Sequence, residues 1–157
     1  MASIIRGSDD FDTAINGRVL QVVSASVGTS TSTTSTSFIN TPLALAITPT
    51  STSSKILIKV DAPIHTSSTG TYGVLLTLFR GTVSGTNLGH STQGMAYSYD
   101  GDGNTVDTGT SMSYLDSPST TSAQTYTLGM KSENSSSTGS VMLYSCKGTI
   151  TLMEIAG

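Results

Sequence analysis

The sequence is poor in charged residues and in residues that form cross-links. Only 11% of its 157 residues are charged and the net charge is −3, whereas about a quarter of an ordinary soluble domain is charged. Seven Lys and Arg residues are too few for a phosphate-binding patch, which argues against nucleic-acid binding. The single cysteine, Cys146, excludes a disulfide within the chain and is typical of synthesis in a reducing cytoplasm.

Tryptophan and long hydrophobic runs are also missing. The longest apolar runs span about six residues, far below the roughly 20 residues that a membrane-spanning helix needs. The N-terminal stretch MASIIRGSDDFD combines one Arg with acidic residues and lacks the apolar segment of a secretory signal. We therefore expect neither a membrane partner nor a cleaved signal peptide.

Small hydroxyl residues are the abundant class, with 27 Ser and 27 Thr. Disorder normally combines high net charge with low hydrophobicity, but 36% of these residues are hydrophobic. Threonine suits a pleated surface, and Ser and Thr can hydrogen-bond across neighbouring strands. The run TSTTSTSFIN, residues 31–40, is therefore predicted to be an outer strand that enters the fold at Phe38. A disordered loop is the alternative.

From Arg18 onward the chain reads as short strands separated by turn sequences. In the segment TITLMEI, residues 149–155, alternation places Ile150, Leu152 and Glu154 on one face. The segments 55–60 and 74–79 are apolar on both faces, which predicts a covered outer face, commonly by another subunit. No stretch has helical periodicity. The expected strands are residues 18–26, 32–40, 43–48, 55–62, 72–80, 94–99, 111–117, 124–131, 141–146 and 149–155.

This spacing predicts an all-β protein built as an antiparallel β-sandwich. We expect one sandwich domain over residues 18–157, preceded by an N-terminal arm of residues 1–17. The arm holds Ile4, Ile5 and Phe11 beside an acidic cluster. Apolar groups in a segment too short to fold by itself are expected to dock into a partner. Ile4, Ile5 and Phe11 are therefore the predicted partner-binding residues.

One acidic segment, DGDGNTVD at residues 100–107, begins like a calcium-binding loop. The match then fails, because position six is Thr105 rather than Gly and position twelve is Ser111 rather than Glu. A Gly-rich turn with solvated carboxylates is the simpler interpretation, and weak calcium binding is the alternative. No metal site is predicted.

The two histidines, His65 and His90, lie beside turn residues and are interpreted as loop positions. Two histidines without a third clustered ligand do not specify a metal. The sequence contains no Gly-x-Ser-x-Gly motif, and abundant Ser and Asp make a Ser-His-Asp combination uninformative. We therefore predict no catalytic residue, no cofactor and no enzymatic activity.

Cys146 follows VMLY in an expected strand and is interpreted as a buried, inert thiol rather than a reactive one. Tyr97, Tyr99 and Tyr114 are expected to pack in the core or at a subunit contact, with a glycan-binding surface as the alternative.

Arg80 and Lys59 are rare charges in apolar strands. They are expected either to pair with Asp61 or Glu154 at a subunit contact or to lie on a solvated edge.

Five phrases of the chain occur in the same order in a module of tailed-phage structural proteins, notably those of cyanobacterial and marine phages. They lie at Gly17–Val23 (GRVLQVV), Thr48–Leu57 (TPTSTSSKIL), Tyr114–Pro118 (YLDSP), Tyr126–Leu128 (YTL) and Ile150–Ile155 (ITLMEI). The chain resembles this module over about residues 17–157. The resemblance rests on the order of the phrases and implies a trimeric jelly roll, as in fibre heads and capsid decoration proteins.

Many such modules end long tail-fibre chains, whereas only the short arm precedes the module here, which favours a compact virion component. The resemblance then implies a capsid decoration or cement protein, a homotrimer that binds the major capsid protein on the outside of the phage head. Its arm and trimer base would make the contact and stabilise the particle. The alternative is the glycan-binding, receptor-recognising head of a tail fibre. Either protein would lie on the virion surface after assembly in the host cytoplasm.

Overall fold

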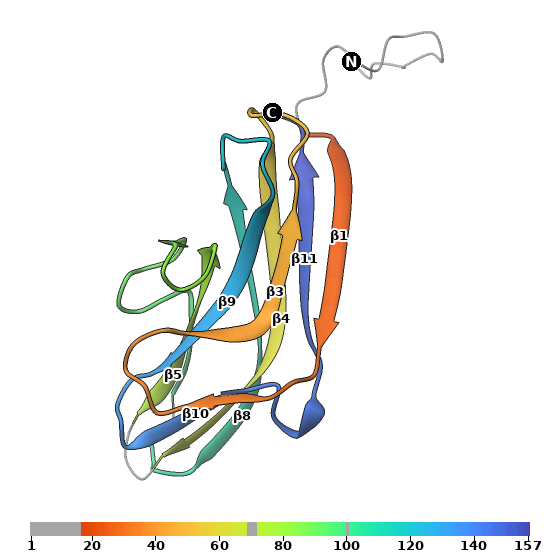
Figure 1. The fold of residues 1–157 in the computed structure, drawn as a ribbon. Helices are drawn as coiled ribbons and strands as arrows, with labels where there is room; N and C mark the ends of the chain where they lie inside the picture. The colour runs from red at the N-terminus through yellow and green to blue at the C-terminus, as the bar shows by residue number, and fades with distance from the viewer. Residues whose placement is uncertain (1–16, 69–71, 100) are drawn as a thin grey trace, which may run out of the picture.

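The computed structural model describes residues 17–68, 72–99 and 101–157 and shows an all-β architecture (Figure 1). The strands are β1 (Val19–Val27), β2 (Thr31–Thr33), β3 (Ile39–Ile47), β4 (Lys55–Ser68), β5 (Gly73–Arg80), β6 (Thr86–Asn87), β7 (Ala96–Tyr99), β8 (Thr105–Asp116), β9 (Gln124–Ser132), β10 (Ser137–Val141) and β11 (Gly148–Ile155). One short 3-10 turn, η1 (Leu143–Ser145), separates the last two strands.

Two antiparallel sheets face each other as the two layers of a sandwich (Figure 1). The first sheet has the order β1-β11-β4-β10-β2, in which β11 and β10 pair with successive parts of the same edge of β4. β8 pairs along the opposite edge of β4. The second has the order β3-β9-β5-β6, with β7 also paired to β5. The antiparallel β-sandwich predicted from the sequence is confirmed.

The eight main strands pair in a nested pattern along the chain. The first pairs with the last (β1 with β11), the second with the seventh (β3 with β9), and the third with the sixth (β4 with β8). The fourth and fifth, β5 and β7, also pair. This nesting is the topology of a jelly roll, a fold used by viral capsid domains and by lectins.

The core fills the space between the two sheets with aliphatic side chains and one tyrosine. Alternation in β11 buries Ile150, Leu152 and Glu154, the three residues that the sequence placed together on one face. The largest fully buried side chains are Tyr126, Leu43, Ile56, Ile58, Leu76, Leu78, Leu128, Met130, Met142, Ile150, Leu152 and Glu154.

The chain itself supplies the cover for β5, one of the two strands that the sequence showed as apolar on both faces. Residues 74–79 of β5 are all buried. The segment 81–95 folds back against this strand, with Leu88 N donating to Leu78 O and Met95 N to Leu76 O. Val83 of the same segment lies beside Phe79 next to Gly129 of β9. No second subunit is therefore needed to cover β5, contrary to the expectation from the sequence.

The long hydroxyl run is ordered, but only its ends are strands. β2 takes Thr31–Thr33 and β3 begins at Ile39. Between them the backbone bends, because side-chain hydroxyls accept backbone N–H groups two residues on. Ser35 N donates to Thr33 Oγ1 at 3.0 Å, and Ser37 N donates to Ser35 Oγ at 3.1 Å. The prediction of a continuous strand over residues 32–40 is wrong in its middle.

Three further segments differ from the predicted strands. β4 and β8 extend through Ser- and Gly-rich stretches that the sequence presented as turns, because each supplies the other with a paired neighbour from Ile56 to Ser67. β10 begins at Ser137 and ends at Val141, so the expected strand over 141–146 is wrong.

The predicted arm of residues 1–17 lies almost entirely outside the described residues. Gly17 is its last residue, and Gly17 N donates to Ala156 O at 2.9 Å. The chain therefore enters the sandwich beside its own C-terminal end, at the upper end of the molecule in Figure 1.

Candidate binding surfaces

Two different surfaces lie on the outer face of the β4–β8 pair, one at each end. Facing pairs run down it from Leu57–Leu115 through Lys59–Ser113 and Asp61–Ser111. They continue through Pro63–Gly109 to His65–Asp107. The first pair lies toward the upper end of Figure 1 and the last toward the lower end.

The upper end of this face carries four apolar side chains in register across four strands. Val22 of β1 lies opposite Met153 of β11, which lies opposite Leu57 of β4, which lies opposite Leu115 of β8. Val22 is 54% exposed and Leu115 49%, while Leu57 and Met153 are half-buried. We call these four residues the apolar row. An apolar surface of this kind on an open sheet face is typical of a protein contact.

Glu154 lies behind the apolar row, on the inner face of β11, and has no exposed surface. Its carboxylate accepts hydrogen bonds from Gln21 Nε2 at 2.6 Å and from the Thr50 N–H and hydroxyl at 2.7 Å each. Burial would raise the pKa of Glu154, but the hydrogen bonds outweigh it and lower the pKa to about 2. The carboxylate therefore joins β1, β11 and the loop after β3.

Arg80 forms a second tie, between the two sheets. Its Nη1 lies 3.2 Å from Asp116 Oδ2, which also accepts the Tyr126 hydroxyl at 2.8 Å. Burial and the hydrogen bond to Asp116 raise the pKa of Tyr126. Asp116 belongs to β8 and its two partners to β5 and β9, so the cluster has a structural role.

Lys59 pairs with Asp61 on the outer face, where both side chains are about half exposed. The hydrogen bond from Lys59 lowers the pKa of Asp61, and Ser111 adds to this effect. Lys59 therefore does pair with Asp61, but on an exposed surface rather than in a buried contact, whereas Arg80 takes Asp116 instead of Asp61 or Glu154.

The lower end of the same face is shaped by a segment that leaves the sheet. β10 and β11 both pair with one edge of β4, with Val141 opposite Ile64 and Thr149 opposite Asp61. The seven residues from 142 to 148 therefore lie beside a stretch of β4 that is only two residues long, at positions 62 and 63. We call residues 142–147 the extruded loop.

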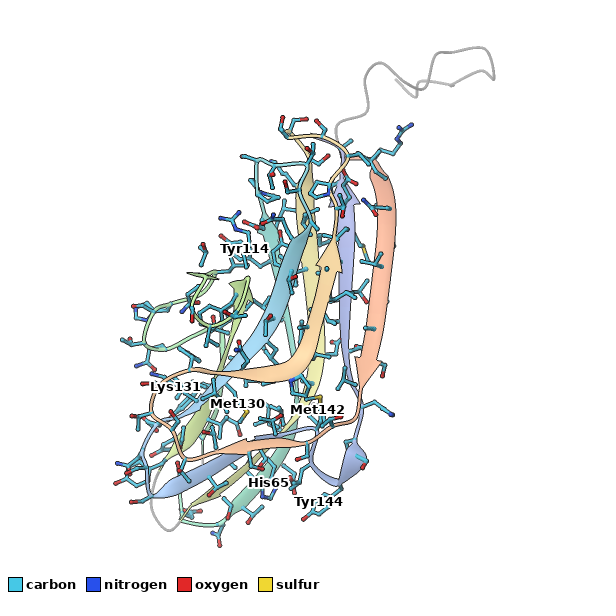
Figure 2. All side chains as sticks on the ribbon, in the orientation of Figure 1. His65, Tyr114, Met130, Lys131, Met142 and Tyr144 are labelled. Carbon is cyan, nitrogen blue, oxygen red and sulfur yellow. The ribbon has the colours of Figure 1, made fainter. Side chains whose placement is uncertain are left out.

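The extruded loop has an unusual backbone. Met142, Tyr144 and Ser145 have φ values of 56°, 55° and 60°. The left-handed region is uncommon for non-glycine residues and is costly for bulky ones. Met142 is fully buried, whereas Tyr144 is 82% exposed. Figure 2 shows the Tyr144 side chain extending away from the sandwich at its lower end.

A groove lies between the extruded loop and the β4–β8 face. It consists of two hollows of about 350 Å³ and about 520 Å³ that share Pro63, Gly109 and Cys146. The lower hollow is otherwise lined by Ile64, His65, Asp107, Thr108, Leu143 and Tyr144. The upper hollow is otherwise lined by Asp61, Ala62, Thr110, Ser111, Lys147 and Thr149.

The structure corrects the interpretation of the acidic segment and of His65. Asp107 lies in strand β8 rather than in a turn, and its Oδ1 lies 2.7 Å from Nδ1 of His65 in β4. His90 does lie in a turn, where its Nδ1 accepts the N–H groups of Thr92 and Gln93. Across residues 17–68, 72–99 and 101–157 no group of three or more His, Cys, Asp or Glu side chains could hold a metal ion.

Cys146 is exposed, so its assignment as a buried thiol is wrong. It lies in the extruded loop instead of a strand, and it lines both hollows of the groove.

The three tyrosines that were expected in the core or at a subunit contact are exposed by 46% (Tyr97), 50% (Tyr99) and 37% (Tyr114). Tyr97 and Tyr99 have ring centroids 5.7 Å apart, and the Tyr97 hydroxyl donates to Glu133 Oε2 at 2.6 Å. Partial burial and this hydrogen bond raise the pKa of Tyr97. These tyrosines therefore do not belong to the core of the chain.

The predicted partner-binding residues Ile4, Ile5 and Phe11 lie outside the described residues. The sequence analysis missed the apolar row and Tyr144. Alternation in 149–155 did place Met153 opposite the buried face, which was a signal for one member of the row. Tyr144 carried no such signal, because VMLYSC has the composition of a strand.

The solved structures that the chain is similar to are viral proteins, and the likeness to them is weak. No protein-family model and no curated protein sequence matches it. The chain is similar to VP2 in the crystal structure of an infectious bursal disease virus subviral particle, with 13% identity and a TM-score of 0.44 over 99% of this chain and 42% of that one. It is also similar to a protein in the crystal structure of the T13 particle of this virus, with 10% identity, a TM-score of 0.42, and coverage of 99% and 40%.

The chain thus spans about two fifths of the length of these solved proteins. Identities near 10% and TM-scores below 0.5 do not indicate a shared function. In the described part of the chain no helix is long and apolar enough to cross a membrane.

Proposed function

We propose that the chain is a non-enzymatic virion structural protein, a homotrimeric decoration protein on the outside of a tailed-phage head. In this proposal Ile4, Ile5 and Phe11 of the arm bind the major capsid protein. The apolar row forms the contact between copies of the chain.

Two observations support the virion role. The nested strand pairing is that of a jelly roll, which viral capsid domains use. The phrases shared with tailed-phage structural modules also lie on elements of this sandwich, including β1, β4 and β11. Because a fold hosts many functions, the choice of role depends on the surface.

The apolar row is the observation that carries the proposal. Full burial of a Val, Leu or Met side chain is worth about 1.5–3 kcal/mol, so covering four partly exposed ones contributes about 4 kcal/mol in total. Association costs about 4–15 kcal/mol. The row alone would not hold a trimer, and additional contacts are required.

A charge placed in the row tests this contact. Leu115→Asp should convert the trimer to a monomer in analytical ultracentrifugation, because a carboxylate cannot be buried there without a partner. Ser113→Asp is the matched control, since Ser113 lies two residues away on the same exposed face, opposite Lys59. A wild-type chain that is already monomeric at high micromolar concentration would contradict the trimer. Equal behaviour of the two variants would contradict the row as its contact.

Deletion of residues 1–12 tests the arm. The truncated chain should keep its oligomeric state but lose binding to isolated phage heads. Full binding after the deletion would contradict the assigned role of Ile4, Ile5 and Phe11.

The copy number in the virus particle separates the decoration role from the tail-fibre role. Quantitative mass spectrometry against the major capsid protein should find hundreds of copies of a decoration protein. A handful of copies would place the chain on the tail and favour the receptor-binding alternative.

A further inference from the structure

We propose that the groove beside the extruded loop binds an oligosaccharide, with Tyr144 as the stacking platform and Asp107 as a hydrogen-bond acceptor. This site lies at the opposite end of the β4–β8 face from the apolar row. It does not depend on the decoration role, since a head protein or a tail protein could carry it.

The backbone of the extruded loop is the first argument. β10 could continue into β11 along β4, since only positions 62 and 63 of β4 separate their pairings. The chain instead inserts a bulge that holds three non-glycine residues in the left-handed region. Each such residue costs about 1 kcal/mol or more. Bulges and strained residues of this kind gather next to functional sites, where they redirect a side chain.

The base of the loop is fixed, so Tyr144 is presented on a rigid support. The Met142 side chain is fully buried, and Met142 N donates to Pro63 O at 3.1 Å. On the other side the loop lies against Gly28, where an added Cβ would be 3.1 Å from Ser145 O. Two buried or close contacts thus hold the loop while Tyr144 remains 82% exposed. An aromatic ring held in this way contributes little to the core and is available to a ligand.

The groove lining has the chemistry that recognises a sugar. Carbohydrate rings offer an apolar face that packs on an aromatic ring, together with hydroxyls that donate to carboxylates. Tyr144 supplies the ring, and Asp107, which is 68% exposed, supplies the carboxylate. His65 is only 15% exposed and holds Asp107 through Nδ1 at 2.7 Å. Gly109 leaves the floor bare, since an added Cβ would meet nothing within 4 Å.

Other ligand classes fit the lining less well. Asp61 and Asp107 would repel a phosphate, and Lys147 is the one Lys or Arg among the residues that line the groove. A lipid tail would cut the hydroxyls of Thr110 and Thr149 off from water. The two hollows adjoin at Pro63, Gly109 and Cys146, which suits a ligand of several linked rings.

The full chain should be tested on a glycan array that carries bacterial surface polysaccharides together with hexose and hexosamine oligomers. At least one of these glycans is expected to bind. Cys146 is the only cysteine of the chain and lines the groove, so it serves as a reporter. The bound glycan should slow the reaction of Cys146 with a thiol reagent by fivefold or more.

Three variants locate the bound glycan. Tyr144→Ala and Gly109→Val should each weaken binding at least tenfold, the first by removing the platform and the second by filling the floor. Gly109→Val has space for its side chain, so it should fold normally. Tyr99→Ala is the matched control, because Tyr99 is an exposed tyrosine on the other sheet, and it should bind as the wild type does.

Three outcomes would overturn the proposal. The first is that no glycan on the array binds. The second is that a glycan binds with equal affinity to the Tyr144→Ala and Gly109→Val variants, or loses affinity with Tyr99→Ala instead. The third is that a synthetic peptide of residues 1–16 protects Cys146 while no glycan does, which would make the groove a docking site for the arm.

Discussion

The two ends of the β4–β8 outer face show two ways of building a surface on the same pair of strands. At the upper end four strands pair in register through Val22, Met153, Leu57 and Leu115 and contribute one apolar side chain each, and the one register shift of the β1–β11 pair lies between Val19 and Gln21. At the lower end the ladder beside β4 is interrupted, and a strained loop stands over Pro63 and Gly109. The upper surface is formed by the side chains of paired strands, whereas the lower one is formed by a backbone loop that leaves the sheet.

This difference has a consequence for mutation. We expect a substitution in the apolar row to leave the neighbouring strands in place, because each of the four strands is held by hydrogen bonds to at least one other strand of the sheet. The groove depends on one loop conformation, which in turn depends on what anchors it. Changes to the anchor should therefore affect the fold and the groove together, while changes to the row should affect assembly alone.

The largest expected effect comes from removing the anchor of the extruded loop. Met142→Ala should lower the free energy of unfolding by about 3–4 kcal/mol, because the side chain is fully buried. The Cys146 thiol should also react faster, since the loop is no longer fixed. Met153→Ala, at the upper end, should cost less than about 1 kcal/mol. Urea unfolding measures both, and similar losses in the two variants would contradict the difference between the ends.

The second effect is the response of the upper end to acid. The pKa of Glu154 is about 2, below its ordinary value of 4.5. Its contribution to stability is therefore complete above pH 4.5 and is lost as pH falls from 4.5 toward 2. The difference corresponds to about 3 kcal/mol. Urea unfolding from neutral pH down to about pH 2.5 should show this loss.

Glu154→Gln should be less stable at neutral pH and should depend less on pH in this range. Asp61→Asn is the control, because Asp61 lies on the surface and its lowered pKa reflects an exposed pair with Lys59. A wild-type curve that stays flat down to about pH 2.5 would show that the hydrogen bonds to Glu154 do not stabilise the carboxylate.

The third effect is a gain in stability at the lower end. Tyr144→Gly should raise the free energy of unfolding by about 1 kcal/mol, because glycine adopts the left-handed region without strain. The same substitution should abolish glycan binding. Ser113→Gly, in a regular part of β8, should instead lower stability by about 0.5–1 kcal/mol. A loss of stability in Tyr144→Gly would show that the ring supports the fold.

The smallest effect is expected between the two ends, at the surface pair Lys59–Asp61. A double-mutant cycle with Lys59→Ala and Asp61→Ala should give a coupling of about 0.3 kcal/mol, as for other exposed ion pairs. A coupling above about 1 kcal/mol would show that this pair joins the two surfaces energetically.

The sequence predicted the sandwich because period-two alternation reflects burial directly. In β11 the three residues that alternation placed together on one face are the buried ones, Glu154 included. Alternation could not predict the nested pairing, because it does not show which strands are neighbours in a sheet. The resemblance to phage modules supplied the jelly-roll expectation instead.

The sites were harder to predict than the fold. The apolar row could not be predicted without the register of four strands, because Val22 lies far from Leu115 and Met153 in the sequence. VMLYSC has the composition of a strand, but the pairing of β10 and β11 with one edge of β4 forces these residues out of the sheet. His65 and Asp107 were assigned to turns because Ser and Gly surround them, but they lie opposite each other in the paired strands β4 and β8.

The manner in which Glu154 is stabilised bears on how the protein responds to the ionic strength of its surroundings. Its partners are an amide, a hydroxyl and a backbone N–H, with no cation among them. Dissolved ions screen exposed charge pairs but have little access to hydrogen bonds to a buried carboxylate. With so few charges in the whole sequence, the fold should melt at nearly the same temperature in dilute buffer and in concentrated sodium chloride.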